Sequence, residues 1–387
     1  MSIKVEDYYA PATFQRMKAF ADQHETPFVV IDRQIIADAY DQLGNCFPFA
    51  KVYYAVKANP AIEIIELLRD KGSSFDIASI YELDKVMSRG VGPERISYGN
   101  TIKKSRDIRY FFEKGVRMFA TDSEADLRNI AKAAPGAKVY VRILTEGSTT
   151  ADWPLSRKFG CQTDMAMDLL ILARQLGLEP YGISFHVGSQ QRDISVWDAA
   201  IAKVKVIFER LKEEDGIELK MINMGGGFPA NYITRTNSLE TYAEEIIRFL
   251  KEDFGDDLPE IILEPGRSLI ANAGVLVSEV VLVARKSRTA VERWVYADVG
   301  KFSGLIETMD ESIKFPIYTE KKGEVEEVVI AGPTCDSADI MYENYKYGLP
   351  LNLAIGDRLY WLSTGAYTTS YSAVEFNGFP PLKAYYI

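Results

Sequence analysis

Lys57 is a charged residue at the end of an apolar run (positions 52–56), and it is the first candidate for covalent chemistry. A lysine amine that is desolvated in an apolar pocket loses its proton more easily and can form a Schiff base with a carbonyl compound. The alternative is a structural lysine that packs its stem along a strand and extends its amine into water. The residues around Lys57 leave both interpretations open.

Three consecutive glycines at positions 225–227 follow another apolar run. Because glycine has no side chain, backbone N–H groups in such a loop can approach a phosphate closely. A simple turn is the alternative for a run of glycines. The hydroxyl groups of Ser189 and Tyr367 are further candidates for contacts with the same phosphate.

Glu264 follows the apolar residues 261–263 and precedes Arg267 by three positions. Arg267 or Arg142 could keep this carboxylate ionised. An ionised carboxylate could pair with a protonated pyridine nitrogen, such as that of pyridoxal 5′-phosphate (PLP), and the pairing would keep the ring electron-poor. An ordinary Glu–Arg ion pair is the alternative. His186 lies between apolar neighbours and is either a core histidine or a ring that stacks on a flat cofactor.

These residues end or follow short apolar runs that alternate with helical patterns along the chain. The runs occupy residues 52–58, 74–79, 96–100, 117–123, 138–144, 182–189, 221–228 and 261–268. The first five begin about 21 or 22 residues apart, close to the length of one strand, one helix and two short loops. Eight such units predict a (β/α)8 barrel of the α/β class, with the active site at the C-terminal ends of the strands. A doubly wound sheet fits less well, because no GxGxxG motif opens the pattern.

The pattern changes near residue 270, where Val- and Tyr-rich runs follow one another without long helices between them. Such runs are typical of an antiparallel β-sheet domain. We therefore expect two domains, a cofactor-binding barrel at residues 26–270 and a β-sheet domain formed by residues 1–25 plus 271–387.

The composition of the 387-residue chain excludes several classes of protein. A formal net charge of −10 argues against a nucleic-acid or anionic membrane surface. Three scattered cysteines and two histidines predict neither a disulfide framework nor a metal site. The N-terminal residues have no signal-peptide pattern, and no apolar run has the length of a membrane span. We expect a metal-free enzyme of the cytoplasm.

Seven motifs in order closely resemble the fold-type III PLP enzymes, and within them the ornithine/lysine/arginine decarboxylases of bacterial type. The motifs are YAVKAN (54–59), FDIAS (75–79), FHVGSQ (185–190), GGGF (225–228), EPGR (264–267), GPTCDSAD (332–339) and GAYTTSYSAVEFNGF (365–379). The resemblance extends from near residue 25 to the last residue. It implies PLP as the cofactor, a small basic amino acid as the substrate, and a head-to-tail homodimer with shared active sites.

The resemblance also implies a role for each matching residue. Lys57 would form the Schiff base, His186 would stack on the PLP ring, and Glu264 would pair with the pyridine nitrogen. The residues implied to hold the phosphate are Ser189, Gly226, Gly227, Arg267 and Tyr367. The residues implied to form a polar network around Lys57 and the ring are Asp76, Glu82 and Arg142.

Cys335 and Asp336 would reach into the active site from the partner subunit. Cys335 would protonate the α-carbon after CO2 leaves, whereas composition alone would make it a small buried apolar residue. Asp336 would bind the distal ammonium group of the substrate. A second acid is expected from the segment 305–312, where Asp310 aligns better than Glu307.

Two acids without an obvious partner arginine favour a substrate that yields a diamine. The sequence therefore predicts decarboxylation of L-ornithine and/or L-lysine to putrescine and cadaverine, a reaction of polyamine biosynthesis. The two substrates differ by one methylene, which a pocket discriminates by only about 1–3 kcal/mol, so the sequence does not choose between them.

Three alternatives stay open at this point. A diaminopimelate decarboxylase, or another fold-type III amino-acid decarboxylase, shares the barrel, and EPGRSLIANAG (264–274) looks like the diaminopimelate branch. FDIAS, FNGF and the Asp after Cys335 are more typical of the ornithine branch. A racemase would use a tyrosine in place of the Cys335–Asp336 pair, and a non-catalytic relative of the antizyme-inhibitor kind is expected to lack PLP residues.

Overall fold

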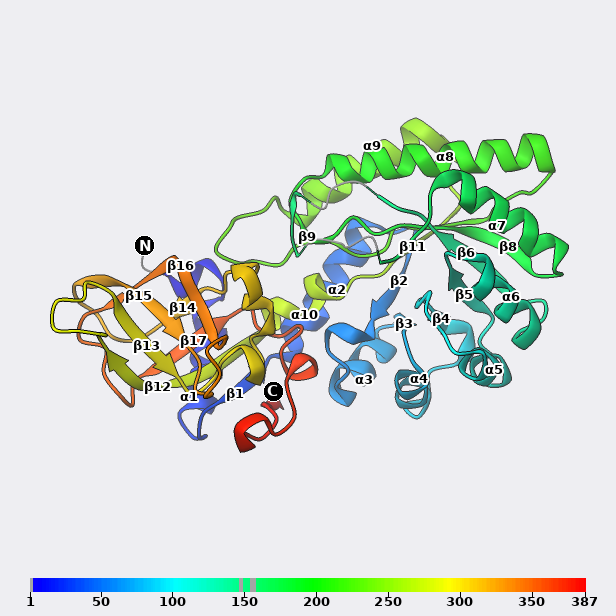
Figure 1. Cartoon of the computed structure of the whole chain (residues 1–387). Helices are drawn as coiled ribbons and strands as arrows, with labels where there is room; N and C mark the ends of the chain where they lie inside the picture. The colour runs from blue at the N-terminus through cyan, green and yellow to red at the C-terminus, as the bar shows by residue number, and fades with distance from the viewer. Residues whose placement is uncertain (1–2, 146–148, 154–157) are drawn as a thin grey trace. The chain divides into compact units, whose positions relative to one another are not determined.

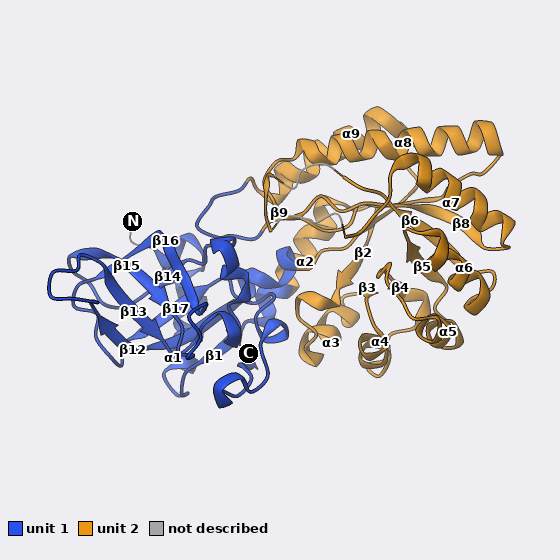
Figure 2. Ribbon diagram, viewed as in Figure 1, with its two compact units in different colours: residues 1–36, 230–236, 267–387 blue, residues 37–229, 237–266 orange. Residues whose placement is uncertain are grey.

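The computed structural model describes residues 3–145, 149–153 and 158–387. The chain forms two compact units, shown in Figure 2: unit 1 comprises residues 1–36, 230–236 and 267–387, and unit 2 comprises residues 37–229 and 237–266. These bounds differ from those of the predicted domains, because residues 26–36, 230–236 and 267–270 group with the C-terminal part of the chain.

Unit 2 contains a closed barrel of eight parallel strands (Figure 1). Around the barrel the strands are β2 (Ala50–Ala55), β3 (Ser74–Ile77), β4 (Ile96–Tyr98), β5 (Met118–Thr121), β6 (Lys138–Arg142), β8 (Glu179–Ser184), β10 (Met221–Asn223) and β11 (Glu260–Leu263). Parallel pairing of β11 with β2 closes the ring. The predicted (β/α)8 barrel is confirmed.

One helix precedes the first barrel strand, and helices connect the later ones. They are α2 (Arg33–Cys46), which begins in unit 1, α3 (Ile62–Asp70), α4 (Ile80–Met87), α5 (Ser105–Glu113), α6 (Glu124–Ala133), α7 (Thr163–Gln175), α8 (Ser195–Asp215) and α9 (Leu239–Phe254). α9 illustrates why these segments are helical: the Ser238 hydroxyl accepts from the Thr241 N–H at its start, and Gly255, with a φ of 73°, ends it. The remaining short elements of unit 2 are η2 (Val56–Ala58), η3 (Pro93–Arg95), β7 (Ala151–Trp153) and β9 (Ser189–Gln191), with β7 and β9 paired antiparallel.

Large side chains from six barrel strands form one buried cluster. Its members are Tyr53, Met118, Ala120, Tyr140, Tyr181, Met221 and Ile262. Gly182 is required beside this cluster, because a Cβ there would lie 2.2 Å from the carbonyl oxygen of Met221. The barrel is therefore packed rather than hollow, and the ends of its strands are left to carry a site.

Unit 1 is built on an eight-stranded sheet. Its path runs β14 (Ile317–Tyr318), β17 (Arg358–Leu362), β12 (Gly274–Ala284), β13 (Arg293–Ala297), β15 (Val325–Ala331) and β16 (Ile340–Pro350), with β1 (Phe28–Ile31) paired to both β12 and β18 (Lys383–Tyr386). Most pairs are antiparallel, but β13–β15 and β1–β18 are parallel. The separate, mainly antiparallel sheet domain is confirmed, and its two parallel pairs depend on connections that apolar runs do not record.

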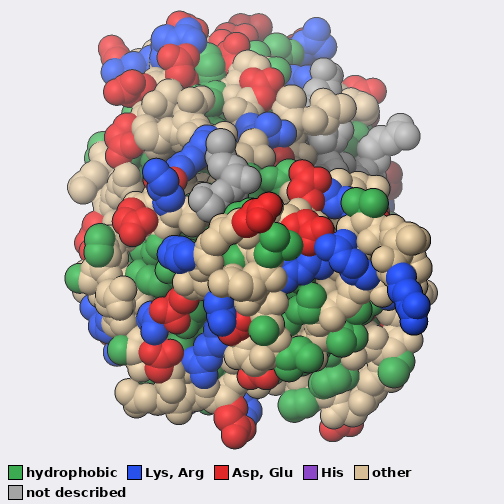
Figure 3. Space-filling view, turned by 90° about the vertical axis from the view of Figure 1, so that its left-hand side faces the viewer, with side chains coloured by type: hydrophobic (Ala, Val, Ile, Leu, Met, Phe, Trp, Pro, Cys, Tyr) green, Lys and Arg blue, Asp and Glu red, His purple; other side chains and the backbone are tan. Residues whose placement is uncertain are grey.

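Helix α1 (Pro11–Ala21) packs against this sheet through Phe14 and Met17, which share a buried cluster with Phe28, Val277 and Tyr360. The other short helices of unit 1 are η1 (Val5–Asp7), α10 (Arg267–Ile270), η4 (Ala271–Ala273), η5 (Lys301–Ser303), η6 (Ile306–Glu311), η7 (Thr369–Tyr371) and η8 (Phe376–Gly378). On the face in Figure 3, acidic and basic side chains are interspersed. Within the described ranges, no helix is both long enough and apolar enough to cross a membrane.

Candidate active site

Lys57 lies in η2, directly after β2, at the C-terminal rim of the barrel. The turn that carries it is fixed by backbone hydrogen bonding from the Ala55 N–H to the Pro265 carbonyl (3.0 Å) and by the Tyr54 hydroxyl, which donates to the Asn59 carbonyl (2.9 Å). The Lys57 side chain is exposed, so the desolvated amine expected from the sequence is not what the protein chain alone provides. The fold places this amine at a rim that a ligand can reach.

Two carboxylates lie at the C-terminal ends of the barrel strands on either side of β2. Asp76 is on β3 and Glu264 follows β11. Burial, reinforced by the charge of Glu264 and opposed by Lys57, raises the pKa of Asp76 well above its usual value. Burial also raises the pKa of Glu264, against the hydrogen bond from Asn223 and the charges of Lys57 and Arg142. The rim therefore combines two partly buried acids with two cations.

Asn223, the last residue of β10, joins Glu264 to the glycine loop. Its amide nitrogen donates to Glu264 Oε1 (2.5 Å), and its amide oxygen accepts from the Gly225 N–H (2.9 Å). The side chain is 1% exposed, so both hydrogen bonds are shielded from water. Asn223 was not among the predicted site residues, although a polar side chain between an apolar strand and three glycines was an available signal.

His186 follows β8, with its ring beside the same charges. Burial, with the nearby cations Arg142 and Lys57, lowers the pKa of His186 well below its usual value, so the ring is neutral. The Gly188 N–H donates to Nδ1 (3.0 Å), which places the remaining ring proton on Nε2. A neutral ring can lie against a flat aromatic cofactor without bringing a second positive charge to its face.

Arg142 and Glu82 complete the polar network predicted around Lys57. Arg142 ends β6, and burial lowers its pKa, while Glu264, Asp122 and Asp76 work in the opposite direction. Glu82 lies in the first turn of α4, where its carboxylate accepts from the Ala78 N–H (2.7 Å). Burial raises the pKa of Glu82, partly offset by that hydrogen bond and by Lys57.

The glycine loop after β10 needs glycine at each position. Gly225 and Gly227 have φ angles of 64° and 102°, which favour glycine strongly. A Cβ at Gly226 would lie 2.6 Å from the carbonyl oxygen of Glu264, and one at Gly227 would lie 2.7 Å from that of Gly188. The loop thus packs its backbone against the segments that carry Glu264 and His186. Ser189, at the start of β9, lies next to Gly188 in the chain.

In unit 1, Arg267 and Glu307 form a buried ion pair. Arg267 Nη1 and Nη2 lie 2.7 and 2.5 Å from the two Glu307 oxygens, and Nη1 also donates to the Tyr232 hydroxyl (2.9 Å). The side chains of the pair are only 3% and 4% exposed. The Arg267 guanidinium also lies 4.8 Å from the ring centre of Tyr367. Because both carboxylate oxygens of Glu307 bind Arg267, Glu307 is a poorer candidate than Asp310 for the acid that binds the substrate.

Breaking this pair is expected to destabilise the fold. Glu307→Gln leaves the Arg267 charge buried without its counter-ion, a change that costs about 3–5 kcal/mol in comparable pairs. We expect a clear fall in the urea midpoint of the cofactor-free protein, measured by tryptophan fluorescence. Glu218→Gln, which removes an exposed partner of Lys212, is the control and should leave the midpoint unchanged. Equal midpoints for Glu307→Gln and the unmodified chain would contradict the assignment.

Cys335 and Asp336 both lie exposed on the loop between β15 and β16. Asp310 is also exposed, at a kink inside η6 where its φ is 51°. The next residue, Glu311, anchors this kink, because its carboxylate accepts from the N–H groups of residues 343, 344 and 345. All three acids and the thiol lie in unit 1, whereas Lys57 and its network lie in unit 2.

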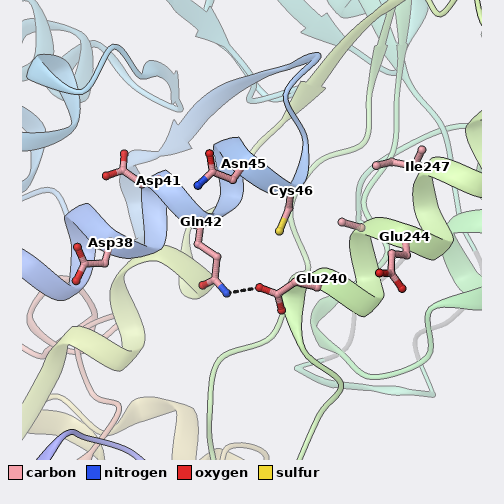
Figure 4. Close-up of a pocket in the computed structure, with 9 residues that line it drawn as sticks. Asp38, Asp41, Gln42, Asn45, Cys46, Glu240, Glu244 and Ile247 are labelled. Atoms are coloured by element: carbon pink, nitrogen blue, oxygen red, sulfur yellow. Dashed lines mark hydrogen bonds between the residues drawn. The ribbon is translucent and has the colours of Figure 1, made fainter.

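A separate cavity of about 570 Å³ lies between α2 and α9 in unit 2 (Figure 4). Its lining residues are Asp38, Asp41, Gln42, Asn45, Cys46, Glu240, Ala243, Glu244 and Ile247. Gln42 donates to Glu240 across it (2.7 Å). The cavity contains no predicted site residue, and all of its lining residues lie on two helices of unit 2.

Known proteins resemble this chain over most of its length. A family model for the pyridoxal binding domain of pyridoxal-dependent decarboxylases matches residues 33–271. A lysine/ornithine decarboxylase from Selenomonas ruminantium is 33% identical over 366 residues, covering 94% of this chain and 90% of that protein. A lysine/ornithine decarboxylase from Vibrio vulnificus, solved with cadaverine, superposes with a TM-score of 0.87 at 28% identity, covering 98% and 99% of the two chains. The arginine decarboxylase of Paramecium bursaria Chlorella virus, solved with agmatine, gives 0.86 at 30% identity over 96% and 100%.

Proposed function

Because the chain belongs to the pyridoxal-dependent decarboxylases, we propose that it decarboxylates L-ornithine and L-lysine, releasing CO2 and the diamines putrescine and cadaverine. The observation that carries PLP chemistry is the rim of unit 2, where Lys57 shares a polar network with Asp76, Arg142 and Glu264. A cofactor also fits the chemistry of this rim, since Asp76 Oδ1 is buried and has no hydrogen-bond partner among the described residues. The glycine loop beside it suits a phosphate.

PLP, when bound, supplies an electron-poor ring that takes up the electron pair left on the α-carbon as CO2 departs. Lys57 would hold it covalently, Glu264 would face its pyridine nitrogen, and the neutral His186 would lie against its ring. The proposed phosphate contacts are Ser189, Gly226, Gly227, Arg267 and Tyr367. Asp76 and Arg142 would complete the charge balance around Lys57.

The substrate's distal ammonium group would meet Asp336 and Asp310, and Cys335 would donate its Sγ proton to the α-carbon. Both acids are exposed, and Glu307 is taken by Arg267. The relatives support a basic substrate, because the Vibrio protein was solved with cadaverine and the viral protein with agmatine. A diamine-forming reaction accounts for both acids, whereas diaminopimelate carries a second carboxylate that would need an arginine.

The proposed reaction is tested by CO2 release from four amino acids with PLP present: ornithine, lysine, arginine and meso-diaminopimelate. We expect activity with ornithine and lysine, with kcat/KM values that differ by about 10- to 200-fold at most, since one methylene separates them. Activity confined to diaminopimelate would overturn the substrate assignment. Racemisation without CO2 release would overturn the reaction class.

The distal ammonium contact predicts a selective loss in Asp336→Asn. Removing one partner of a charge pair costs about 2–5 kcal/mol, so kcat/KM for ornithine and lysine should fall at least about 30-fold. Residual turnover of norvaline, which has no distal amine, should change little. Ser337→Ala, in the same exposed loop, is the control. An equal loss with norvaline would mean that Asp336 acts elsewhere.

A head-to-tail homodimer is part of the proposal. The face around Cys335 carries exposed apolar side chains on a neighbouring segment, with Val374 76% and Phe376 38% exposed. Such side chains are typical of a surface that a partner covers. If active sites are shared, mixing Lys57→Ala with Cys335→Ala, each of low residual activity, should restore about a quarter of the unmodified activity after random subunit exchange. A cytoplasmic location fits this activity and remains a proposal.

A further inference from the structure

Three segments of unit 1 interlock around Cys335: η5, the loop 332–339 and the stretch 373–378. The resemblance assigns a role to Cys335 but none to the residues that hold it. A proton donor works only within hydrogen-bond reach of the atom that it protonates, so the support of the thiol matters as much as its presence.

Asp339 fixes the base of the loop. It is 2% exposed, and its carboxylate accepts from the Thr334 N–H (3.1 Å), the Thr334 hydroxyl (2.7 Å) and the Lys301 N–H (2.8 Å). Glycines allow this close packing, because a Cβ at Gly300 or Gly332 would lie 2.2 or 2.4 Å from an Asp339 oxygen. The loop is thereby tied to η5.

Asn377 contacts the loop at Cys335 itself. Its side-chain oxygen accepts from the Cys335 backbone N–H (2.9 Å). Asn377 has a φ of 52°, a left-handed conformation that asparagine tolerates better than most residues. Its segment is in turn attached to η5, since the Ala373 N–H donates to the Phe302 carbonyl (2.8 Å) and the Phe302 and Phe376 rings lie 5.1 Å apart. η5 thus contacts both the cysteine loop and the segment that carries Asn377.

We propose that Asn377 is a positioning residue that holds the Cys335 thiol in place for proton transfer to the α-carbon. This inference rests on the proposed function. Asp339 sets the path of the loop, and Asn377 fixes the backbone of the reacting residue. A displacement of about 1 Å at a reacting group can cost a hundredfold in rate, so one hydrogen bond at this place has a measurable effect.

Asn377→Gly removes the carboxamide while keeping a residue that accepts the left-handed backbone. We expect kcat for lysine and ornithine to fall about 10- to 100-fold, with PLP binding, followed by absorption, unchanged within about twofold. Asn377→Asp retains an oxygen that accepts from the Cys335 N–H and should keep kcat within about threefold of the unmodified enzyme. Glu375→Gly is the matched control, because Glu375 lies in the same segment with a φ of 57°, and kcat should not change.

A double-mutant cycle tests whether Asn377 acts through Cys335. In the Cys335→Ala background, Asn377→Gly should cause no further loss of the residual turnover. An undiminished kcat in Asn377→Gly, or the same fold-loss with and without Cys335, would overturn the inference.

Hydrogen exchange separates this inference from the proposed function. The Cys335 amide should exchange faster in Asn377→Gly and remain protected in Asn377→Asp. A chain that releases no CO2 from any of the four amino acids would overturn the proposed function. In that case an unprotected Cys335 amide in the unmodified protein would still overturn the contact.

Discussion

Lys57→Ala is expected to remove the visible absorption band at about 420 nm that is typical of a Schiff base between PLP and a lysine. Decarboxylation should fall by at least about a thousandfold, because Lys57 is the proposed covalent anchor and carries a charge at the rim. Lys57 lies directly after β2, and its charge acts on both Asp76 and Glu264, so it is the lysine that the proposal assigns to the cofactor.

Lys51→Ala is the matched control for this experiment. Lys51 is exposed on the same strand and pairs with Glu260 (3.2 Å) near the N-terminal end of the barrel strands. Its loss should leave both the band and the rate unchanged. Borohydride reduction of the unmodified enzyme should attach the pyridoxyl group to the peptide that contains Lys57. A band that persists in Lys57→Ala would refute the Schiff-base assignment.

The barrel and most of its rim were predictable because both depend on local patterns. The spacing of apolar residues within a short stretch indicates whether that stretch forms a strand or a helix. Parallel strands in a closed barrel then bring their C-terminal ends to one rim. Lys57, Asp76, Arg142, His186 and Glu264 end or directly follow such strands, so their gathering required only the strand count.

Other features depend on pairings between distant residues, which a local pattern does not contain. The bond between Arg267 and Glu307 joins residues 40 positions apart and turns a candidate substrate acid into a structural one. The position of β1 in the sheet of unit 1 depends in the same way on its partners β12 and β18. Asn223 is a third case, since only the folded barrel brings the end of β10 beside Glu264. In each case the partner lies outside the stretch of residues that a local pattern describes.

Glu264→Gln is expected to lower kcat about a hundredfold to a thousandfold while the band of the Lys57 linkage remains. Burial raises the pKa of Glu264, whereas the hydrogen bond from Asn223 and the charges of Lys57 and Arg142 act in the opposite direction and favour the carboxylate. A neutral amide keeps the shape but not the charge that would hold a proton on the pyridine nitrogen.

Glu260→Gln is the control for this second variant, because Glu260 lies at the start of the same strand, β11, and accepts from the Tyr181 hydroxyl (2.8 Å). It should change kcat by no more than about twofold, since the N-terminal ends of barrel strands serve stability rather than catalysis. PLP affinity should also persist in Glu264→Gln, because the proposed phosphate contacts are untouched. An unchanged kcat in Glu264→Gln with PLP bound would place the pyridine nitrogen against a different residue. A loss of PLP together with activity would instead assign Glu264 to binding, and measuring the band and the rate on the same preparation separates the two outcomes.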